Sequence, residues 1–359
     1  MNKQWLTACG MGLASASAGA IGQTNVTLYG IADIYTEIVT NQPTPAQGSG
    51  TLVRMGSGGK SGSRWGIKAV EELRDGWRVD VRLESSIFMN NGKGVATGGF
   101  DRGAWLALSR AGWGGVRFGR QYTSLFDVFD HYSLTNGYST LYEPDGAIVG
   151  INFRENNMVK YYADFDRFSL RAHYSFGGTP GAFSAGAGSG FGIEYSSGLV
   201  GVAAGYDDVN GAVPNVTHFR RYAIAAMIRP GPATFIAGFE HGSANVTTPG
   251  VVTRFDFYWA GVRYRFTPAL QALGGFYYEN VVLQNPGVGA AAAAPANPKQ
   301  VTLEMDYSLS KSTLLYVAGG YAWRAALDFD NYNYNFLGYS LASGKTSSAG
   351  VALGMRKQF

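Results

Sequence analysis

Carboxylates and aromatic rings gather in one long connecting segment, residues 119–154, which follows the short alternating run Val116-Arg117-Phe118. The segment has neither a helix-length apolar face nor a clean strand pattern. A connection of this length is usually functional or disordered, and its many aromatic side chains, which need a packing surface, argue against disorder. We therefore expect it to fold into the lumen of a β-barrel and to narrow a pore there. The residues of this constriction loop are Tyr122, Phe126, Asp127, Asp130, Glu143 and Asp145.

Basic residues recur at alternate positions of the segments that flank this loop. Between Trp77 and Glu84 every second residue is large and apolar, and the residues between them are all charged. Such period-two alternation indicates a strand with one apolar face and one face in water. Bases on the lumen wall and acids on the loop would create a transverse field across a narrow aqueous gap. The wall residues that we expect at the constriction are Arg64, Lys68, Arg78, Arg82, Arg117, Arg120 and Arg154.

The composition favours strands over transmembrane helices. The chain has 359 residues, is 46% hydrophobic, has a mean hydropathy of −0.06, and contains 51 Gly, 22 Tyr and 21 Phe. Beyond the first 22 residues no apolar run is long enough for a membrane-spanning helix. A membrane location then requires a closed barrel, because only helices and closed barrels satisfy all backbone groups in hydrocarbon. The net charge of +4 is mild, and the sequence shows no basic cluster typical of nucleic-acid binding.

The first 22 residues have the features of a cleaved secretory signal peptide. Lys3 supplies the positive start, residues 5–20 form a small and apolar core, and residues 20–22 form a small-x-small cleavage site. The remaining residues, 23–359, are expected to form a single barrel domain. The single cysteine, Cys9, lies in the signal segment, so the exported chain lacks disulfides and cannot be a small disulfide scaffold.

Short turns and long loops alternate along the chain. Eight segments rich in Gly, Asn and Pro are long, and the connections between them are short. In a transmembrane antiparallel up-and-down β-barrel this alternation separates the two ends, and eight long loops imply about 16 strands. The long segments are 41–60, 87–100, 119–154, 175–189, 207–216, 241–253, 280–299 and 324–346.

Several motifs resemble those of Gram-negative general diffusion porins, of the trimeric type found in β-proteobacteria and neisseriae. The strand Val26-Thr27-Leu28-Tyr29-Gly30-Ile31-Ala32-Asp33 and the run Ser63-Arg64-Trp65-Gly66-Ile67-Lys68 both match. Gly119-Arg120-Gln121 opens the third loop and Arg154-Glu155-Asn156-Asn157 closes it. The sequence ends on Phe359, which resembles the family's outer-membrane assembly signal. Lys357 and the turn Pro144-Asp145-Gly146 depart from the usual pattern.

The resemblance implies a non-enzymatic, homotrimeric channel in the outer membrane that lets small hydrophilic solutes and ions diffuse passively. Lipopolysaccharide and the outer-membrane assembly machinery, which would read the C-terminal strand, are its implied partners. The basic wall predicts a weak anion preference. Four acids that also point inward oppose this preference, namely Asp33, Glu37, Asp80 and Glu84.

Other functions remain open at this point. A channel specific for one small anionic solute would need a ladder of aromatics or bases along the pore, and Tyr122, Phe126 and Phe129 could begin one. An outer-membrane barrel hydrolase could use His131 beside Asp130, although no Gly-x-Ser-x-Gly elbow is present. No cofactor or metal site is expected from ligand spacing, apart from calcium on acidic outer loops.

Overall fold

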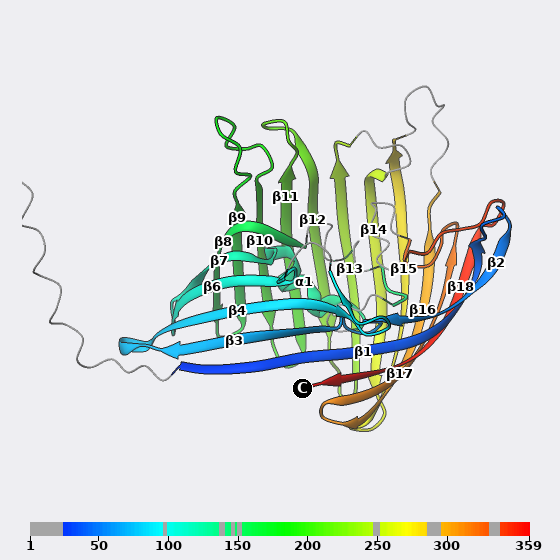
Figure 1. Cartoon of the computed structure of the whole chain (residues 1–359), viewed down its shortest axis with the longest axis horizontal. Helices are drawn as coiled ribbons and strands as arrows, with labels where there is room; N and C mark the ends of the chain where they lie inside the picture. Colours follow the sequence, from blue (N-terminus) through cyan, green and yellow to red (C-terminus); the bar gives the residue numbers. More distant parts are fainter. Residues whose placement is uncertain are drawn as a thin grey trace, which may run out of the picture.

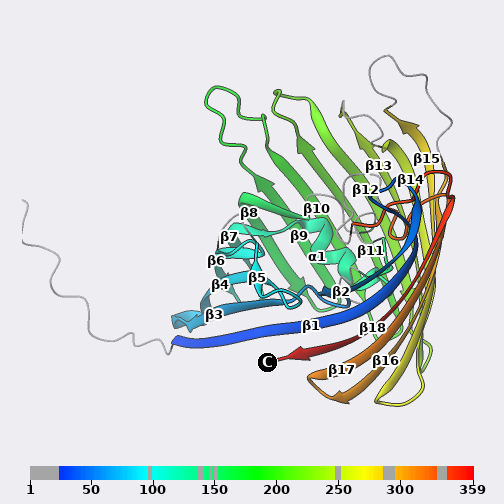
Figure 2. The same ribbon diagram turned by 45° about the vertical axis from the view of Figure 1, so that its right-hand side comes forward.

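The computed structural model describes residues 24–95, 99–135, 141–144, 148, 153–246, 252–285, 296–329 and 338–359. The expected signal segment and Asp145 lie outside these residues. In the described part, antiparallel strands form one sheet that closes on itself, with a short helix, α1 (Ser124–Phe129), inside the barrel (Figures 1 and 2). Among the described residues, no helix has both the length and the apolar character needed to cross a membrane.

Strands make up most of the described chain, and three short helical segments interrupt them. The helical segments are α1, η1 (Arg74–Gly76) and η2 (Asp130–Tyr132). The strands are β1 (Thr24–Pro43), β2 (Ser49–Ser57), β3 (Arg64–Glu72), β4 (Trp77–Phe88), β5 (Lys93–Gly94), β6 (Gly103–Arg110), β7 (Gly114–Tyr122), β8 (Arg154–Phe165), β9 (Phe168–Ser175), β10 (Gly188–Ser196), β11 (Val200–Asn210), β12 (Thr217–Ile228), β13 (Ala233–Ala244), β14 (Val252–Arg265), β15 (Leu270–Gln284), β16 (Lys299–Ser310), β17 (Thr313–Trp323) and β18 (Ser347–Gln358).

The strand count confirms the predicted barrel of about 16 strands. On one side of β1, the segment from Ile34 to Pro43 pairs with β2 and the segment from Thr24 to Ile31 pairs with β3. β2 and β3 are therefore two halves of one wall strand. The two-residue β5 only extends the end of β4. Counted in this way, the described residues form sixteen wall strands, each antiparallel to its neighbours.

The barrel closes where β1 pairs with β18, the first and last strands of the chain (Figure 1). The main-chain N–H of Gly30 donates to the carbonyl oxygen of Phe359 over 2.9 Å, and the N–H of Phe359 donates back over 3.1 Å. No side chain at position 30 would fit, because a Cβ there would lie 2.4 Å from the Phe359 ring and 2.8 Å from the Arg64 carbonyl oxygen. The last residue of the sequence is therefore engaged in the barrel seam.

The two ends of the barrel differ as the alternation of connections predicts. Tight turns such as 73–76, 166–167 and 311–312 lie at one end, which we call the short-turn end, and the long loops lie at the other. Several predicted loops were too long, because β11, β13 and β15 extend into the segments 207–216, 241–253 and 280–299. Most of residues 41–60 lie in strands β1 and β2, and Val53 and Met55 occupy alternate positions of β2 that face outward. The loop between the two strands comprises only residues 44–48.

The outer surface of the barrel is apolar, as the alternation predicts. Val26 and Leu28 on β1 are 68% and 65% exposed, and Leu353 on β18 is 62% exposed. An outward apolar band is what a membrane barrel presents to lipid. The inward face of β14 is also apolar, because Phe255, Phe257 and Trp259 point inward and are fully or almost fully buried. These rings form the surface on which the lumen loop packs.

The lumen loop between β7 and β8, which we call loop 3, is held against this inner surface by an apolar core. Thr123 caps α1 by accepting a hydrogen bond from the N–H of Phe126 over 3.2 Å. Leu125, Phe129 and Tyr132 in the loop pack with the inward rings of β14 in one buried cluster. Six residues are too few for a helical periodicity to be visible in the sequence, which is why α1 was not predicted.

Candidate functional site

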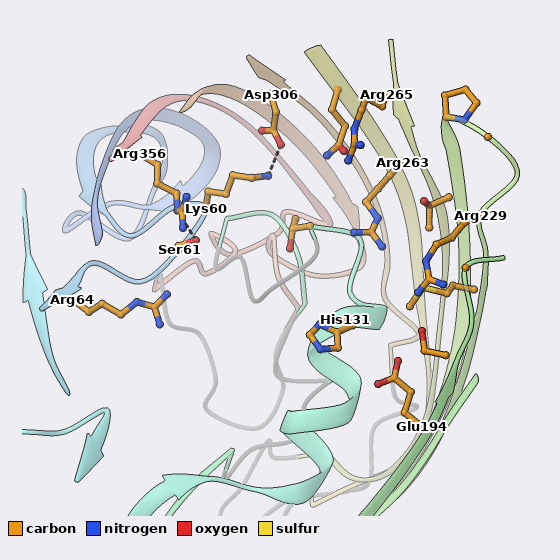
Figure 3. Close-up of a pocket in the computed structure, with 18 residues that line it drawn as sticks. Lys60, Ser61, Arg64, His131, Glu194, Arg229, Arg263, Arg265, Asp306 and Arg356 are labelled. Atoms are coloured by element: carbon orange, nitrogen blue, oxygen red, sulfur yellow. Dashed lines mark hydrogen bonds and ion pairs between the residues drawn. The ribbon is translucent and has the colours of Figure 1, made fainter. Parts of the chain in front are cut away.

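A water-accessible space of about 930 Å³ lies between loop 3 and the short-turn end of the barrel (Figure 3). Loop 3 contributes His131 and Thr135 to its lining, and the rest comes from the wall and from short turns. The charged side chains that line the space are Lys60, Arg64, Glu194, Arg229, Arg263, Arg265, Asp306 and Arg356.

Basic side chains face this space from two opposite sides. Arg229, Arg263 and Arg265 lie on one side, and Lys60, Arg64 and Arg356 lie on the other (Figure 3). Among the described residues, Arg229, Arg263, Arg265 and Arg356 form no ion pair. The space is therefore strongly positive.

The two lining acids are already engaged by neighbouring groups. Lys60 contacts Asp306 over 2.9 Å and also forms an ion pair with Glu304. Glu194 accepts a hydrogen bond from the Tyr132 hydroxyl over 3.2 Å. Neither carboxylate balances the four unpaired guanidinium groups.

Lys60 reaches the space because the wall itself folds inward between β2 and β3. The buried Asp33 carboxylate accepts the main-chain N–H groups of Lys60 and Ser61 over 3.0 and 2.8 Å, and the Tyr316 hydroxyl over 2.6 Å. Ser63 Oγ donates to the Asp33 carbonyl oxygen over 2.8 Å. Asp33 thus fixes residues 58–63 as an inward fold of the wall, and its own charge is satisfied there.

The three predicted loop acids that the structure describes, Asp127, Asp130 and Glu143, are not among the residues that line the space. Asp127 forms an ion pair with the buried Lys160. The buried Glu143 accepts hydrogen bonds from the Leu134 N–H over 2.7 Å, from the Tyr277 hydroxyl over 3.0 Å, and from Thr135. Both carboxylates therefore fasten the loop, so the prediction of an acidic loop face opposite a basic wall was wrong for them.

Asp130 is adjacent in the sequence to His131, which lines the space. Burial raises the pKa of Asp130 to about 6, the nearby His131 and Arg64 lower it, and Asp127 and Glu143 raise it further. Its charge is therefore lost close to neutral pH.

Two of the predicted wall residues, Arg64 and Arg154, differ in their contacts. Arg64 lines the space, 3.8 Å from Glu84. Arg154 donates to the Tyr122 hydroxyl over 2.5 Å and stacks on that ring at 4.3 Å. Tyr122 in turn stacks on Phe126, with the ring centroids 3.8 Å apart.

Arg82 and Arg117 form a ladder with aromatic rings on the same wall. Arg82 lies between Tyr29 and Trp105, at 5.4 and 5.7 Å from the ring centres. Arg117 lies between Trp105 and Tyr162, at 4.2 and 4.8 Å. We call these five residues the basic-aromatic ladder. Lys68 is paired in register with Arg82 on the neighbouring strand.

Two predicted wall residues lie elsewhere. Arg78 forms an ion pair with Asp80 over 2.6 Å beside the turn at residues 111–112, and it lines a different pocket. Arg120 shares the outward parity of the exposed Phe118 and donates to Asn156 over 2.8 Å. The prediction of a lumen position for Arg120 failed because it was inferred from the loop motif and not from strand parity.

The four inward acids expected to oppose the basic wall form ion pairs or hydrogen bonds with neighbouring residues. Glu37 is buried and contacts Arg54 over 2.5 Å and the Tyr339 hydroxyl over 2.6 Å. Glu84 contacts Arg102 over 2.9 Å. With Asp80 paired to Arg78, none of the four predicted opposing acids lines the space.

The sequence matches the model of the Gram-negative porin family over residues 6–324. The chain belongs to the Gram-negative porin family. This membership, together with the closed barrel, places the porin in the outer membrane as a multi-pass β-barrel. It also assigns the chain to a family of channels and not of enzymes, in agreement with the sequence analysis.

Two curated relatives are outer membrane porins. One, from Bordetella pertussis, is 28% identical over 223 residues, which cover 55% of this chain and 57% of the relative. The other, outer membrane porin protein 32 of Delftia acidovorans, is 30% identical over 172 residues, which cover 45% and 47%. The porin thus spans about half the length of the curated relatives it matches.

Solved structures share the fold. An anion-selective porin from Comamonas acidovorans superposes with a TM-score of 0.74 at 23% identity, over 94% of this chain and 100% of that one. OmpT of Vibrio cholerae gives a TM-score of 0.67 at 17% identity, over 94% and 98%. At these identities the likeness shows the barrel architecture alone.

Sequence reasoning missed most of the basic residues that line the space in this porin. Arg263 and Arg265 lie two residues apart on β14, opposite in parity to Tyr264, which is 41% exposed. Their alternation with Tyr264 could have indicated that both arginines face the lumen. It was missed because other inward-facing residues of β14 are aromatic, so the two faces of the strand look alike in the sequence. Arg229 lies in a short turn and Arg356 near the end of β18, where the sequence analysis placed no pore residues.

Proposed function

We propose that the porin is an outer-membrane channel through which small hydrophilic solutes and ions diffuse passively, with a preference for anions. One observation carries the proposal. Six basic side chains line the space beneath loop 3 against two acids, and four of the six form no ion pair with a described residue. Anions gain favourable interactions there, whereas cations are repelled.

The physical basis is a positive potential in a confined aqueous gap. Arginine is permanently charged and offers several N–H donors in a fixed plane, so it can replace part of the hydration shell of an anion. Bases on opposite sides of the gap act on the same ion. Two acids of loop 3, Asp127 and Glu143, are held by other contacts of the loop and do not line the path.

Planar-bilayer recordings of the purified, detergent-refolded porin under a KCl gradient test this proposal. We expect ohmic single-channel steps and a reversal potential of the sign that chloride permeation gives. A reversal potential on the potassium side would overturn the anion preference. Folded protein that gives no steps would overturn the channel function itself.

A channel for a particular anionic solute is the second candidate, and the basic-aromatic ladder favours it. Tyr29, Arg82, Trp105, Arg117 and Tyr162 alternate rings and guanidinium groups along one wall. Such a surface suits an anion with a planar or apolar part. A saturable block of chloride current by an aromatic carboxylate such as benzoate, absent with acetate, would support this candidate. Equal effects of both anions would favour general diffusion.

We infer that the porin assembles as a homotrimer, contacts lipopolysaccharide, and is recognised by the assembly machinery through its C-terminal strand. The exposed apolar band supports a lipid-facing or subunit-facing outer surface. One structure of the similarly folded OmpT is described as a trimer form. A heat-modifiable band of trimer size on gels supports the oligomer, and a monomer in detergent at all concentrations contradicts it.

A further inference from the structure

The wall strand that β2 and β3 share contains more residues than its pairing with β1 can use. Ile34 of β1 pairs with Ser57, whereas Ile31 pairs with Arg64. Three steps along β1 therefore match seven steps along its partner, an excess of four residues. The excess lies in the inward fold, residues 58–63. We propose that the inward fold is a second constriction of the pore, which limits, together with loop 3, the size of the solutes that pass.

The environment of the wall accounts for the direction in which the extra residues leave the sheet. Val53 and Met55 on β2 and Trp65 on β3 are exposed on the outer face, so that side of the wall is apolar. Main-chain N–H and carbonyl groups outside the strand ladder cannot find partners in hydrocarbon. The extra residues therefore enter the aqueous lumen, where Lys60 and Ser61 line the space beneath loop 3 (Figure 3).

Asp33 on β1 holds the inward fold at both ends and in the middle. Its carbonyl oxygen accepts the main-chain N–H of Gly58 over 2.9 Å, and its own N–H donates to Ser63 Oγ over 2.9 Å. Its buried carboxylate accepts the main-chain N–H groups of Lys60 and Ser61. One residue of β1 thus contacts the first, the middle and the last residues of the fold, so Asp33 is a positioning residue for the constriction.

Side chains in the middle of the inward fold reach two further strands. Lys60 forms ion pairs with Glu304 and Asp306 on β16. Ser61 Oγ accepts a hydrogen bond from Nε of Arg356 on β18 over 3.0 Å. Because β1, β16 and β18 all hold it, the inward fold is a fixed border of the space.

Glycine lets the chain reverse within this short length. Gly58 has a φ of +80°, and a Cβ there would lie 2.9 Å from Gly62 Cα. A Cβ at Gly59 would lie 2.5 Å from the hydroxyl oxygen of Tyr316, the same hydroxyl that donates to the Asp33 carboxylate. The close return of the chain and the contacts of Asp33 therefore depend on each other.

The inward fold and loop 3 border the same space, since Lys60 of the fold and His131 of the loop both line it. We call the gap that they border the aperture. The width of a water-filled gap limits the solutes that pass through it. The inference rests on the proposed channel function, and it adds that part of the aperture is formed by the wall itself.

A deletion that removes the excess tests the inward fold. Without residues 59–62, Gly58 is followed directly by Ser63, and a single register with β1 can run through the wall strand. Asp33→Asn accompanies the deletion, so that no unpaired carboxylate faces the lumen. We expect a folded barrel with a single-channel conductance about twofold higher than wild type. It should also admit larger polyethylene glycols, as measured by polymer exclusion in planar bilayers.

Three point variants separate the charge of the fold from its position. Lys60→Met releases Glu304 and Asp306, as the deletion does, but keeps the inward fold. The anion preference should therefore fall in both proteins, whereas the size limit should rise in the deletion alone. Asp33→Ala should also raise the size limit. Asp33→Asn without the deletion should stay near wild type, because its amide oxygen can still accept the two N–H groups.

A folded deletion variant with the conductance and size limit of wild type would overturn the second constriction. If the deletion does not fold, Lys60→Cys decides the question in porin refolded without the expected signal segment. Cys9 is the single cysteine of the sequence, so residue 60 then carries the only thiol. A bulky thiol reagent should block most of the current. Ala46→Cys, in the exposed loop 44–48, is the control and should keep its current.

Full labelling of Lys60→Cys without loss of current would also overturn the inference. Both outcomes require that the wild-type protein conducts. Folded wild-type protein that gives no steps would overturn the channel function itself, so the two failures are distinguishable.

Discussion

The indole N–H of Trp259 on β14 donates to the main-chain carbonyl oxygen of Tyr132 in loop 3 over 2.9 Å. The hydroxyl of the same tyrosine donates to Glu194 on β10. Tyr132 therefore links loop 3 to two separate wall strands at once. Phe129 packs against the indole edge, with the ring centroids 6.5 Å apart. Loop 3 is thus part of the folded core of the barrel.

Removing the Trp259 side chain should loosen loop 3. Trp259→Ala eliminates the hydrogen bond to Tyr132 and leaves a cavity among Phe129 and Phe257, a change that costs about 3–5 kcal/mol in well-packed cores. We expect a lower guanidinium midpoint and noisier single-channel currents. Trp113→Ala, at a 71% exposed turn residue, is the control and should change neither. Quiet, wild-type-like channels from Trp259→Ala would contradict the anchoring role.

Removing a lining arginine should weaken the anion preference. Arg263→Gln deletes a charge that has no ion pair among the described residues, and at about 10 Å in water one charge changes the energy of an ion by about 0.4 kcal/mol, roughly a twofold change in permeability ratio. The reversal potential under a KCl gradient measures it. Arg78→Gln, which removes a guanidinium already paired with Asp80, should leave the ratio unchanged. Equal shifts in both variants would show that total charge, and not position, sets selectivity.

The anion preference should rise as the pH falls through 6. The pKa of Asp130 is raised to about 6, so the carboxylate is an anion near Arg64 at pH 7 and neutral at pH 5. Recordings at the two pH values should show a larger chloride preference at pH 5. In Asp130→Asn the Asp130 contribution to this difference should vanish, whereas His131→Gln should keep it.

The same pKa shift bears on stability. Because the folded state holds the proton of Asp130 at pH values where the unfolded chain has lost it, this residue favours folding less as the pH rises from about 4 to 6. Asp130→Asn should therefore stabilise the barrel above pH 6 and not below pH 4. Unfolding midpoints measured at both pH values check the sign.

A methyl group at Gly30 should disrupt the barrel seam. The Cβ of Gly30→Ala would meet the main-chain oxygen of Arg64 at 2.8 Å as well as the Phe359 ring, so the wall itself must shift. Overpacking of this kind costs about 1–3 kcal/mol. We expect less heat-modifiable folded protein after refolding. Gly319→Ala is the matched control, because its Cβ finds only an ordinary contact at 3.8 Å.

Period-two alternation predicted the strands of the barrel, whereas the length and aromatic content of residues 119–154 predicted the lumen loop. On β1 and β18 the apolar residues that were predicted to face outward do face outward in the structure. Lipid contacts one set of alternate residues of a strand and water contacts the other. The same rule also led to Arg64, Arg82 and Arg117 on the inner wall.

The partners of the charged residues could not be predicted in this way. Glu143 meets Tyr277, which is 134 residues away, and Lys160 reaches Asp127 across 33 residues. Only the closed barrel brings these groups together. The inward face of β14 is apolar where loop 3 covers it and basic beyond the loop. Inward-facing residues of one strand therefore lie in two different environments. A rule that assigns one environment to each face misses Arg263 and Arg265.

The space beneath loop 3 is bounded on one side by loop 3 and on the other by the inward fold at residues 58–63. Different interactions hold these two boundaries in place. Loop 3 is a connecting segment held mainly by apolar packing, whereas the fold between β2 and β3 is wall backbone held by the hydrogen bonds of Asp33. Conditions that soften apolar packing act on one boundary and leave the other in place. Partial loosening of loop 3 would therefore widen the aperture from one side only, and the basic side chains of Lys60, Arg64 and Arg356 would still face whatever passes.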